Sequence, residues 1–294
     1  MTFSEGFRKS ADRASTGGGV GRGGIAVGGG LGGILLVGLY LLLGGDPAAL
    51  TQNDGTGAQG GGQAQNQGLE HCRTGADANE HVDCRIEFTG ISLDRVWGEQ
   101  LPAQAGIEYT APGIVIFDGS TRSACGTASA GTGPFYCPAD ETSYYDVSFF
   151  NQLQRLGGGS GPLSQEYVVA HEFGHHIQKL EGTLHLSDYN NPGADSDAVR
   201  IELQADCYAG IWAHHADDGP DAILEPLTDE QVRDAMATAR AIGDDAIQSH
   251  SGGGVNPDQW THGSSEQREK AFLTGYRTGD MRACDTLGRE GAYR

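Results

Sequence analysis

The chain has 294 residues and a formal net charge of −20, with 39 acidic and 19 basic side chains. This excess of negative charge disfavours binding to nucleic acid or docking on anionic lipid, because both carry charges of the same sign. Glycine totals 48 residues, and much of it falls before residue 65. The region after residue 68 is long enough for one globular domain with a substantial core.

An uncharged apolar segment runs from Ile25 to Leu43. Its length is close to the roughly 20 residues that a helix needs to span a bilayer, which predicts a transmembrane anchor over residues 24–45. Basic side chains outnumber acidic ones in residues 1–23, so the positive-inside rule places that segment in the cytoplasm and the remaining chain outside. A cleaved signal peptide is the alternative; the long polar lead and the poor cleavage sequence after Leu43 favour an uncleaved anchor.

Residues 46–68 consist mainly of Gly, Gln, Asn, Ala and Thr and contain almost no large apolar side chain. Such a composition cannot offset the entropy that is lost on folding, so we predict a flexible linker there. The sequence thus divides into a cytoplasmic N-terminal segment (1–23), a transmembrane anchor (24–45), the linker (46–68) and one folded domain (69–294).

All six cysteines follow the apolar segment. An even number of cysteines in an exported region predicts disulfides. Short loops favour two of the pairs and elimination leaves the third: Cys72–Cys84, Cys125–Cys137 and Cys207–Cys284. Metal binding by some of the cysteines is the alternative, which the absence of any C-x-x-C pair disfavours.

Three segments of the domain have the composition of β-strands. Val82 to Thr89 and Gly113 to Asp118 combine β-branched and aromatic residues between turn formers, with a short helix predicted from Ser92 between them. Ser143 to Phe149 alternates in the same way. A small sheet is therefore expected ahead of the helical second half of the domain.

Several helix starts are marked by residues that cap the first turn. Ser164 is predicted to cap the helix that contains residues 168–178. Two capping boxes predict the starts of later helices: Thr228 with Gln231, and Ser264 with Gln267.

The sequence His171-Glu172-Phe173-Gly174-His175 is an H-E-x-x-H motif within a predicted helix. Residues four apart share one helical face, so the imidazoles of His171 and His175 can reach one zinc ion. Glu172 can then act as general base on a water in the open position of the site. A five-residue match also arises by chance on solvated helices, so the motif needs a third ligand.

Glu202 and Asp206 supply the missing groups in a second predicted helix. They are four residues apart and share a face, and the surrounding residues are largely apolar. Buried carboxylates need partners, and Glu202 would complete a His2Glu zinc site. Asp206 would accept the other N–H of a ligand histidine and so fix its orientation. An ordinary pair of surface charges is the alternative.

Other histidines are further candidates for the site. His262 precedes the last helix and would stabilise the oxyanion of a tetrahedral intermediate, oriented by a carboxylate such as Asp258; packing or capping before that helix is an equal alternative. His176 faces another side of its helix and is not expected to be a ligand. His214 and His215 fit the end of a helix better than a metal site.

These motifs resemble those of the gluzincin zinc metallopeptidases and, more narrowly, the YpfJ-like family of membrane-anchored neutral zinc metallopeptidases. The resemblance covers about residues 53–279 and is carried by these motifs: Gly133–Pro138, Tyr145–Phe150, Val169–His176, Glu202–Cys207 and Thr261–Ser265. It implies bound zinc, peptidase activity and a strand that pairs with extended substrate. Ser143 to Phe149 and Gly113 to Asp118 are the candidates for that strand, with a purely structural sheet as the alternative.

The sequence therefore predicts an α+β, zincin-like metallopeptidase domain with a small sheet, behind a single transmembrane helix. One catalytic Zn2+ is expected, with peptides or proteins as substrates and no nucleic acid partner. The predicted ligands are His171, His175 and Glu202, and the predicted catalytic residues are Glu172 and His262. Two alternatives remain: an anchored zinc-containing scaffold without proteolysis, and a hydrolase of non-peptide envelope amides.

Overall fold

The computed structural model describes residues 2–17, 69–129, 132–252, 254–289 and 291–293. The predicted anchor (24–45) and the predicted linker (46–68) lie outside these residues. Within the described part of the chain, no helix has both the length and the apolar character that a membrane span requires.

The fold is a mixed α+β arrangement, as predicted. Its strands are β1 (Ser15–Thr16), β2 (Gly113–Phe117), β3 (Ser120–Ser123), β4 (Gly126–Ser129), β5 (Phe135–Cys137) and β6 (Thr142–Asp146). Its α-helices are α2 (Gly75–Glu80), α3 (Val82–Ala105), α4 (Phe149–Arg155), α5 (Pro162–Leu180), α6 (Asp197–His215), α7 (Asp229–Ala241), α8 (Asp244–His250) and α9 (Ser265–Thr278). Short 3-10 turns are Leu69–His71, Leu184–Leu186, Pro257–Gln259 and Met281–Cys284.

The main sheet has the strand order β1-β2-β6-β5. Strands β1, β2 and β6 are parallel, and β5 is antiparallel to β6. The strand prediction for Gly113 to Asp118 is confirmed, and the one for Ser143 to Phe149 is confirmed as far as Asp146. Neither is an edge strand, because β1 covers β2 and β5 covers β6. Both were therefore wrong candidates for an edge strand that pairs with substrate, and β5 is the edge strand beside α5.

The prediction of a strand from Val82 to Thr89 is wrong, because this segment begins the 24-residue helix α3. All residues from Cys84 to Gly90 are buried. A helix that is covered on every side lacks the polar face that reveals a period of 3.6 residues in the sequence. Gly90 lies against β2, where an added Cβ would be 2.3 Å from Cδ1 of Ile114.

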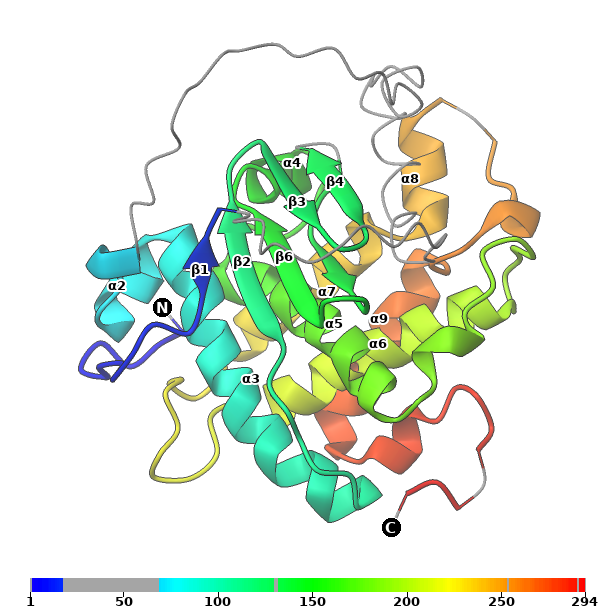
Figure 1. Ribbon diagram of the computed structural model, residues 1–294. Coiled ribbons are helices and arrows are strands. Elements are labelled where there is room, and N and C mark those ends of the chain that lie inside the picture. The colour runs from blue at the N-terminus through cyan, green and yellow to red at the C-terminus, as the bar shows by residue number, and fades with distance from the viewer. Residues whose placement is uncertain (1, 18–68, 130–131, 253, 290, 294) are drawn as a thin grey trace.

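The secondary structure forms layers around α5 (Figure 1). The main sheet packs on α3 and α5, α5 packs on α6, and α6 packs on α9. The main core fills the space between these layers, and a smaller apolar cluster lies under the β3–β4 hairpin. Helix α5 is thereby packed between the sheet and α6, and this close packing restricts the conformations of its side chains.

Residues 2–17 pack against the domain, although the sequence predicts a separate segment over residues 1–23. Phe3 is buried, and β1 extends the main sheet. Lys9 pairs with the buried carboxylate of Glu87, and Arg13 pairs with Asp94 on the same helix, α3. Lys9 and Arg13, two of the basic residues that suggested a membrane-flanking segment, are thus partners of acidic groups in the domain.

The three predicted disulfides are all present: Cys72–Cys84, Cys125–Cys137 and Cys207–Cys284. Both predicted capping boxes are present as well, at Thr228 and at Ser264. Ser164 was the wrong cap for α5, because Pro162 already occupies the first turn and Gly161 is the N-cap. Proline is well suited to that first turn, where its missing N–H costs no hydrogen bond.

Candidate metal centre

Helices α5 and α6 bring the three predicted zinc ligands together. His171 and His175 lie on α5, and Glu202 approaches them from α6. Oε2 of Glu202 is 3.2 Å from Nε2 of His171 and 3.7 Å from Nε2 of His175. All three side chains are buried, so little solvent is available to screen the carboxylate from a cation.

These separations fit a zinc ion. Two ligands on tetrahedral Zn2+ are about 3.3–3.6 Å apart when the bonds to the metal are about 2.0–2.2 Å long. Nε2 of His175 is buried without a hydrogen-bond partner, whereas buried polar atoms normally have one. A cation placed between the three donor atoms would satisfy this nitrogen.

A second group of possible donor atoms occurs among the described residues, formed by His71, Asp83, Cys72 and Cys84. The two cysteines are joined in a disulfide. Neither sulfur is then a thiolate, which is the form of cysteine that binds zinc. The site on α5 and α6 is therefore the candidate metal centre.

Asp206 holds the first histidine, as its spacing from Glu202 predicts. Its carboxylate accepts a hydrogen bond of 2.8 Å from Nδ1 of His171, which fixes the tautomer with Nε2 towards Glu202. Arg268 of α9 donates to both oxygens of Asp206 at 2.9 and 3.0 Å. Burial raises the pKa of Asp206, but Arg268 and His171 outweigh it and lower that pKa. The Asp206 side chain is therefore a buried carboxylate anion with two positively polarised neighbours.

Tyr189 is a site residue that the sequence analysis missed. Its hydroxyl donates to Oε1 of Glu202 at 2.9 Å, while Oε2 faces the two histidines. Burial raises the pKa of Glu202, but His175 and His171 oppose it and leave that pKa well below its ordinary value. The hydrogen bond from Tyr189 would thus favour binding of a metal through one oxygen only. Tyr189 lies in a loop, where no helical spacing marks it.

Glu172 follows His171 on α5 and is buried beside the ligands. Its Oε2 atom has no hydrogen-bond partner among the described residues. Burial raises the pKa of Glu172, an effect that His171 and His175 oppose. A carboxylate with a raised pKa is a stronger base than an exposed one, which suits it to accept a proton from water.

A pocket opens beside Glu172 and His171. Its apolar wall is formed by Pro134, Phe149, Val168, Ile242 and Ile247. The pocket is therefore suited to an apolar side chain of a ligand that lies across the metal centre.

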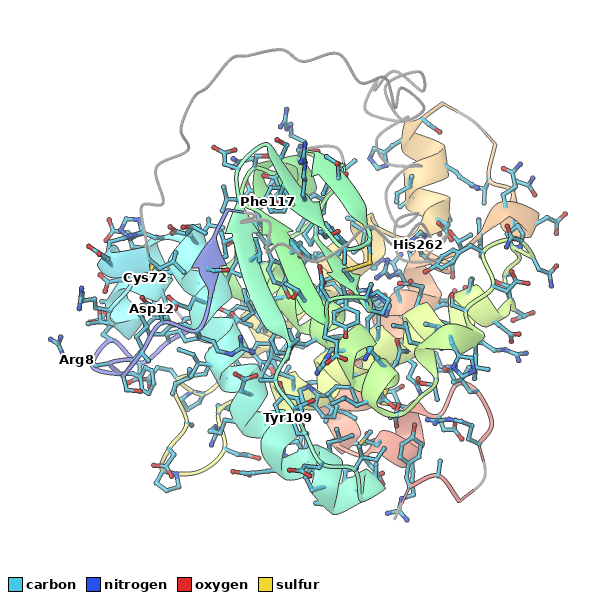
Figure 2. All side chains as sticks on the ribbon, in the orientation of Figure 1. Arg8, Asp12, Cys72, Tyr109, Phe117 and His262 are labelled. Carbon is cyan, nitrogen blue, oxygen red and sulfur yellow. A yellow bond between two sulfur atoms is a disulfide. The ribbon has the colours of Figure 1, made fainter. Side chains whose placement is uncertain are left out.

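His262 lines the same pocket, across from the helix that carries the metal ligands. It contacts Asp244, the first residue of α8, and Figure 2 shows it to the right of the main sheet, with Arg8 and Asp12 of the N-terminal segment to the left. Its Nε2 atom is buried without a hydrogen-bond partner. Such a nitrogen is available to a ligand in the pocket, which favours the site role over the packing role for His262.

The carboxylate partner of His262 is Asp244, and the predicted partner Asp258 is wrong. Oδ1 of Asp244 is 3.2 Å from Nδ1 of His262, and Oδ2 accepts the backbone N–H of His262 at 2.7 Å. Asp258 is exposed instead. Burial lowers the pKa of His262, but Asp244 and Glu202 outweigh it and raise that pKa.

The remaining histidines of the sequence analysis lie outside the metal centre, as predicted. His176 contacts the hydroxyl of Tyr136 at 2.9 Å and the carbonyl oxygen of Thr110 at 2.6 Å. Nδ1 of His214 is 2.7 Å from the carbonyl oxygen of Tyr276, and His215 is near Asp218.

The chain was compared with known proteins. A family model described as "Putative neutral zinc metallopeptidase" matches residues 4–287. An uncharacterised protein of Mycobacterium tuberculosis (strain ATCC 25618 / H37Rv) is 49% identical over 225 residues, which are 74% of this chain and 75% of that protein. The uncharacterised protein YpfJ of Escherichia coli (strain K12) is 40% identical over 215 residues, 70% of this chain and 73% of YpfJ. No solved structure matches. The chain belongs to the neutral zinc metallopeptidase family.

Proposed function

We propose that this protein is a zinc-dependent peptidase that hydrolyses peptide bonds at the α5–α6 centre. The observation that carries the proposal is the convergence of His171, His175 and Glu202 beside Glu172, a buried carboxylate with an unpartnered oxygen. A structural zinc site is closed by four protein ligands, whereas the described residues supply three candidate ligands here, beside a pocket. Membership of the family supports the same reaction class.

Two side chains perform the proton and charge chemistry in this proposal. Zinc, when bound, supplies Lewis acidity, which makes water more acidic and polarises the scissile carbonyl. Glu172 accepts the proton of the attacking water and delivers it to the leaving amine nitrogen. His262 donates from Nε2 to the carbonyl oxygen as negative charge develops there, and Asp244 holds its ring in place.

The pocket and the sheet suggest how a substrate binds. An apolar residue next to the scissile bond would occupy the wall formed by Phe149, Val168 and Ile242. The chain of the substrate would pair with β5, the strand at the end of the sheet beside α5, because extended peptides commonly add to the edge of a sheet. An apolar peptide segment is therefore the preferred substrate class.

The compartment is also a proposal. Three disulfides support a domain outside the cytoplasm, because reducing compartments disfavour such bonds. Membrane attachment through residues 24–45 is proposed from the sequence. The contacts of residues 2–17 with α3 support a location of this segment on the same side of a membrane as the domain. A single span over residues 24–45 would place the two on opposite sides, so the attachment in this proposal does not cross the membrane.

The test compares the full-length protein with Glu172→Gln and, as a matched control, Glu166→Gln, which alters another buried glutamate of α5. Zinc per chain is measured by elemental analysis, and a peptide library is incubated with each protein and read by mass spectrometry. One zinc in all three proteins, with cleavage lost only in Glu172→Gln, is the expected result. Zinc in the wild type without any cleavage would instead favour the scaffold or the non-peptide hydrolase.

A further inference from the structure

The second metal ligand, His175, is held by a neutral amide and not by a carboxylate. Nδ1 of His175 is 2.9 Å from Oε1 of Gln178, one turn later on α5. Nε2 of Gln178 donates to the carbonyl oxygen of Ile201 at 2.7 Å and to Oε1 of Gln204 at 3.1 Å. Both glutamine side chains are fully buried, so water cannot replace these partners.

The amide contacts continue to the C-terminal segment. Nε2 of Gln204 donates to the carbonyl oxygen of Cys284 at 3.2 Å and to the hydroxyl of Tyr293 at 3.3 Å. That hydroxyl lies 2.9 Å from the hydroxyl of Tyr208 on α6. The contacts therefore connect a metal ligand to residues more than 100 positions later in the chain.

The backbone carbonyls at Ile201 and Cys284 give this series of hydrogen bonds one direction. A carbonyl oxygen only accepts, so each glutamine must turn its NH2 group towards one of these carbonyls. Oε1 of Gln178 then faces Nδ1 of His175 and must accept from it. His175 is thereby held as the Nδ1–H tautomer, and its unpartnered Nε2 carries the lone pair that a metal needs.

We propose that Gln178 and Gln204 are positioning residues that fix the tautomer of His175 and couple zinc affinity to the C-terminal segment. The inference rests on the proposed function in one respect, the role of His175 as zinc ligand. The disulfide Cys207–Cys284 ties the same segment to α6, one turn from Gln204. Opening it would release the carbonyl of Cys284, loosen Gln204 and Gln178 in turn, and weaken the hold on zinc.

The first test measures the zinc dissociation constant of the full-length protein by competition with a chelator. Gln178→Leu removes the acceptor of Nδ1 and should weaken zinc binding by roughly 10–100-fold, the usual effect of losing an outer-shell partner. Gln178→Glu keeps the acceptor of Nδ1 and, when its buried carboxyl group is protonated, still donates to the carbonyl of Ile201. This variant should therefore bind zinc more tightly than Gln178→Leu. Gln165→Leu, on the same helix but with Arg85 as its partner, is the matched control and should change nothing.

The tautomer is measured directly by 15N NMR of the imidazole nitrogens in the zinc-free protein. A protonated Nδ1 of His175 is expected in the wild type and in Gln178→Glu, and a mixture of tautomers in Gln178→Leu. This signal separates positioning from a loss of fold, because a misfolded variant would also lose the Nδ1–H signal of His171, which Asp206 holds.

The coupling to the C-terminal segment is tested with two pairs of disulfide mutants. Zinc binding should weaken in Cys207→Ser/Cys284→Ser and remain unchanged in Cys72→Ser/Cys84→Ser, which removes an equally buried bridge that touches neither glutamine. Equal zinc affinity in all variants, with zinc bound by the wild type, would overturn this inference alone. Absence of zinc from the wild type would overturn both the inference and the proposed function.

Discussion

Single residues of the candidate site differ in how far local sequence defines them. The ligands and Glu172 follow from helical spacing, because positions four apart share a face whatever surrounds the helix. The role of Asp244 does not follow from local spacing, because this residue precedes His262 by 18 residues. The two side chains meet only because α8 lies beside the loop that precedes α9. The sequence offered Asp258 as the nearest carboxylate, and proximity along the chain was the wrong guide.

The roles of His262 and Asp244 lead to a prediction about catalysis. Replacing His262 with Phe should lower kcat/KM by about 10²–10³-fold, the usual loss for one oxyanion donor, with zinc content unchanged. Asp244→Asn should cause a smaller loss, because it weakens the hold on the imidazole without removing it. Asp258→Asn is the control, because this exposed side chain should be replaceable without a change in kcat/KM. A loss of kcat/KM in that variant would instead assign the orienting of His262 to Asp258.

At the scale of elements, α5 combines the metal ligands with another buried acid. Glu166 lies on α5 before the motif, and burial raises its pKa to about 7 against the opposing effects of Thr2 and Arg85. An unfolded glutamate releases its proton near pH 4.5, so between that pH and about 7 the folded state binds more protons than the unfolded state. Stability from this group is then complete below pH 4.5 and is lost as the pH rises towards 7.

Glu166→Gln should therefore remove part of the pH dependence of stability. Between pH 4.5 and 7.5 the free energy of unfolding of the wild type should fall by about 3 kcal/mol more than that of the variant. Denaturant unfolding of the zinc-free proteins at the two pH values measures this difference. Glu5→Gln, at an exposed position, controls for the loss of a carboxylate; parallel curves for wild type and Glu166→Gln would contradict the prediction.

At the scale of the whole molecule, the N-terminal segment is part of the folded unit. Oε1 of Glu87 accepts the backbone N–H of Arg13 at 2.7 Å, and Lys9 pairs with the same buried carboxylate. Gly75 leaves room for the segment, because an added Cβ there would be 1.9 Å from the carbonyl oxygen of Ser4. A buried carboxylate that loses its cation is costly, so these contacts should persist whenever the domain is folded.

This packing predicts that residues 2–17 and the domain that begins at residue 69 occupy the same compartment. No cysteine is free in the structure, so a thiol introduced at an exposed serine is a specific target. Ser10→Cys and Ser249→Cys, made separately in the full chain, should react alike with a membrane-impermeant maleimide in intact cells. Labelling of one variant only would place the two ends of the chain on opposite sides and contradict the packed segment. Lysed cells provide the control for reactivity of both thiols.

The sequence by itself determined the features that depend on near neighbours. Helical spacing defined the H-E-x-x-H and E-x-x-x-D groups, short loops indicated two disulfides and left the third, and side chains three residues apart defined the caps at Thr228 and Ser264. Only the tertiary structure decided what depends on contacts between distant segments: the burial of residues 84–90 of α3, the partner of His262, the hydrogen bond from Tyr189 and the packing of residues 2–17. The physical reason is the separation of the interacting residues along the chain. Periodicity and capping act within a few residues, whereas the partners of buried charges depend on which distant segments pack together in the core.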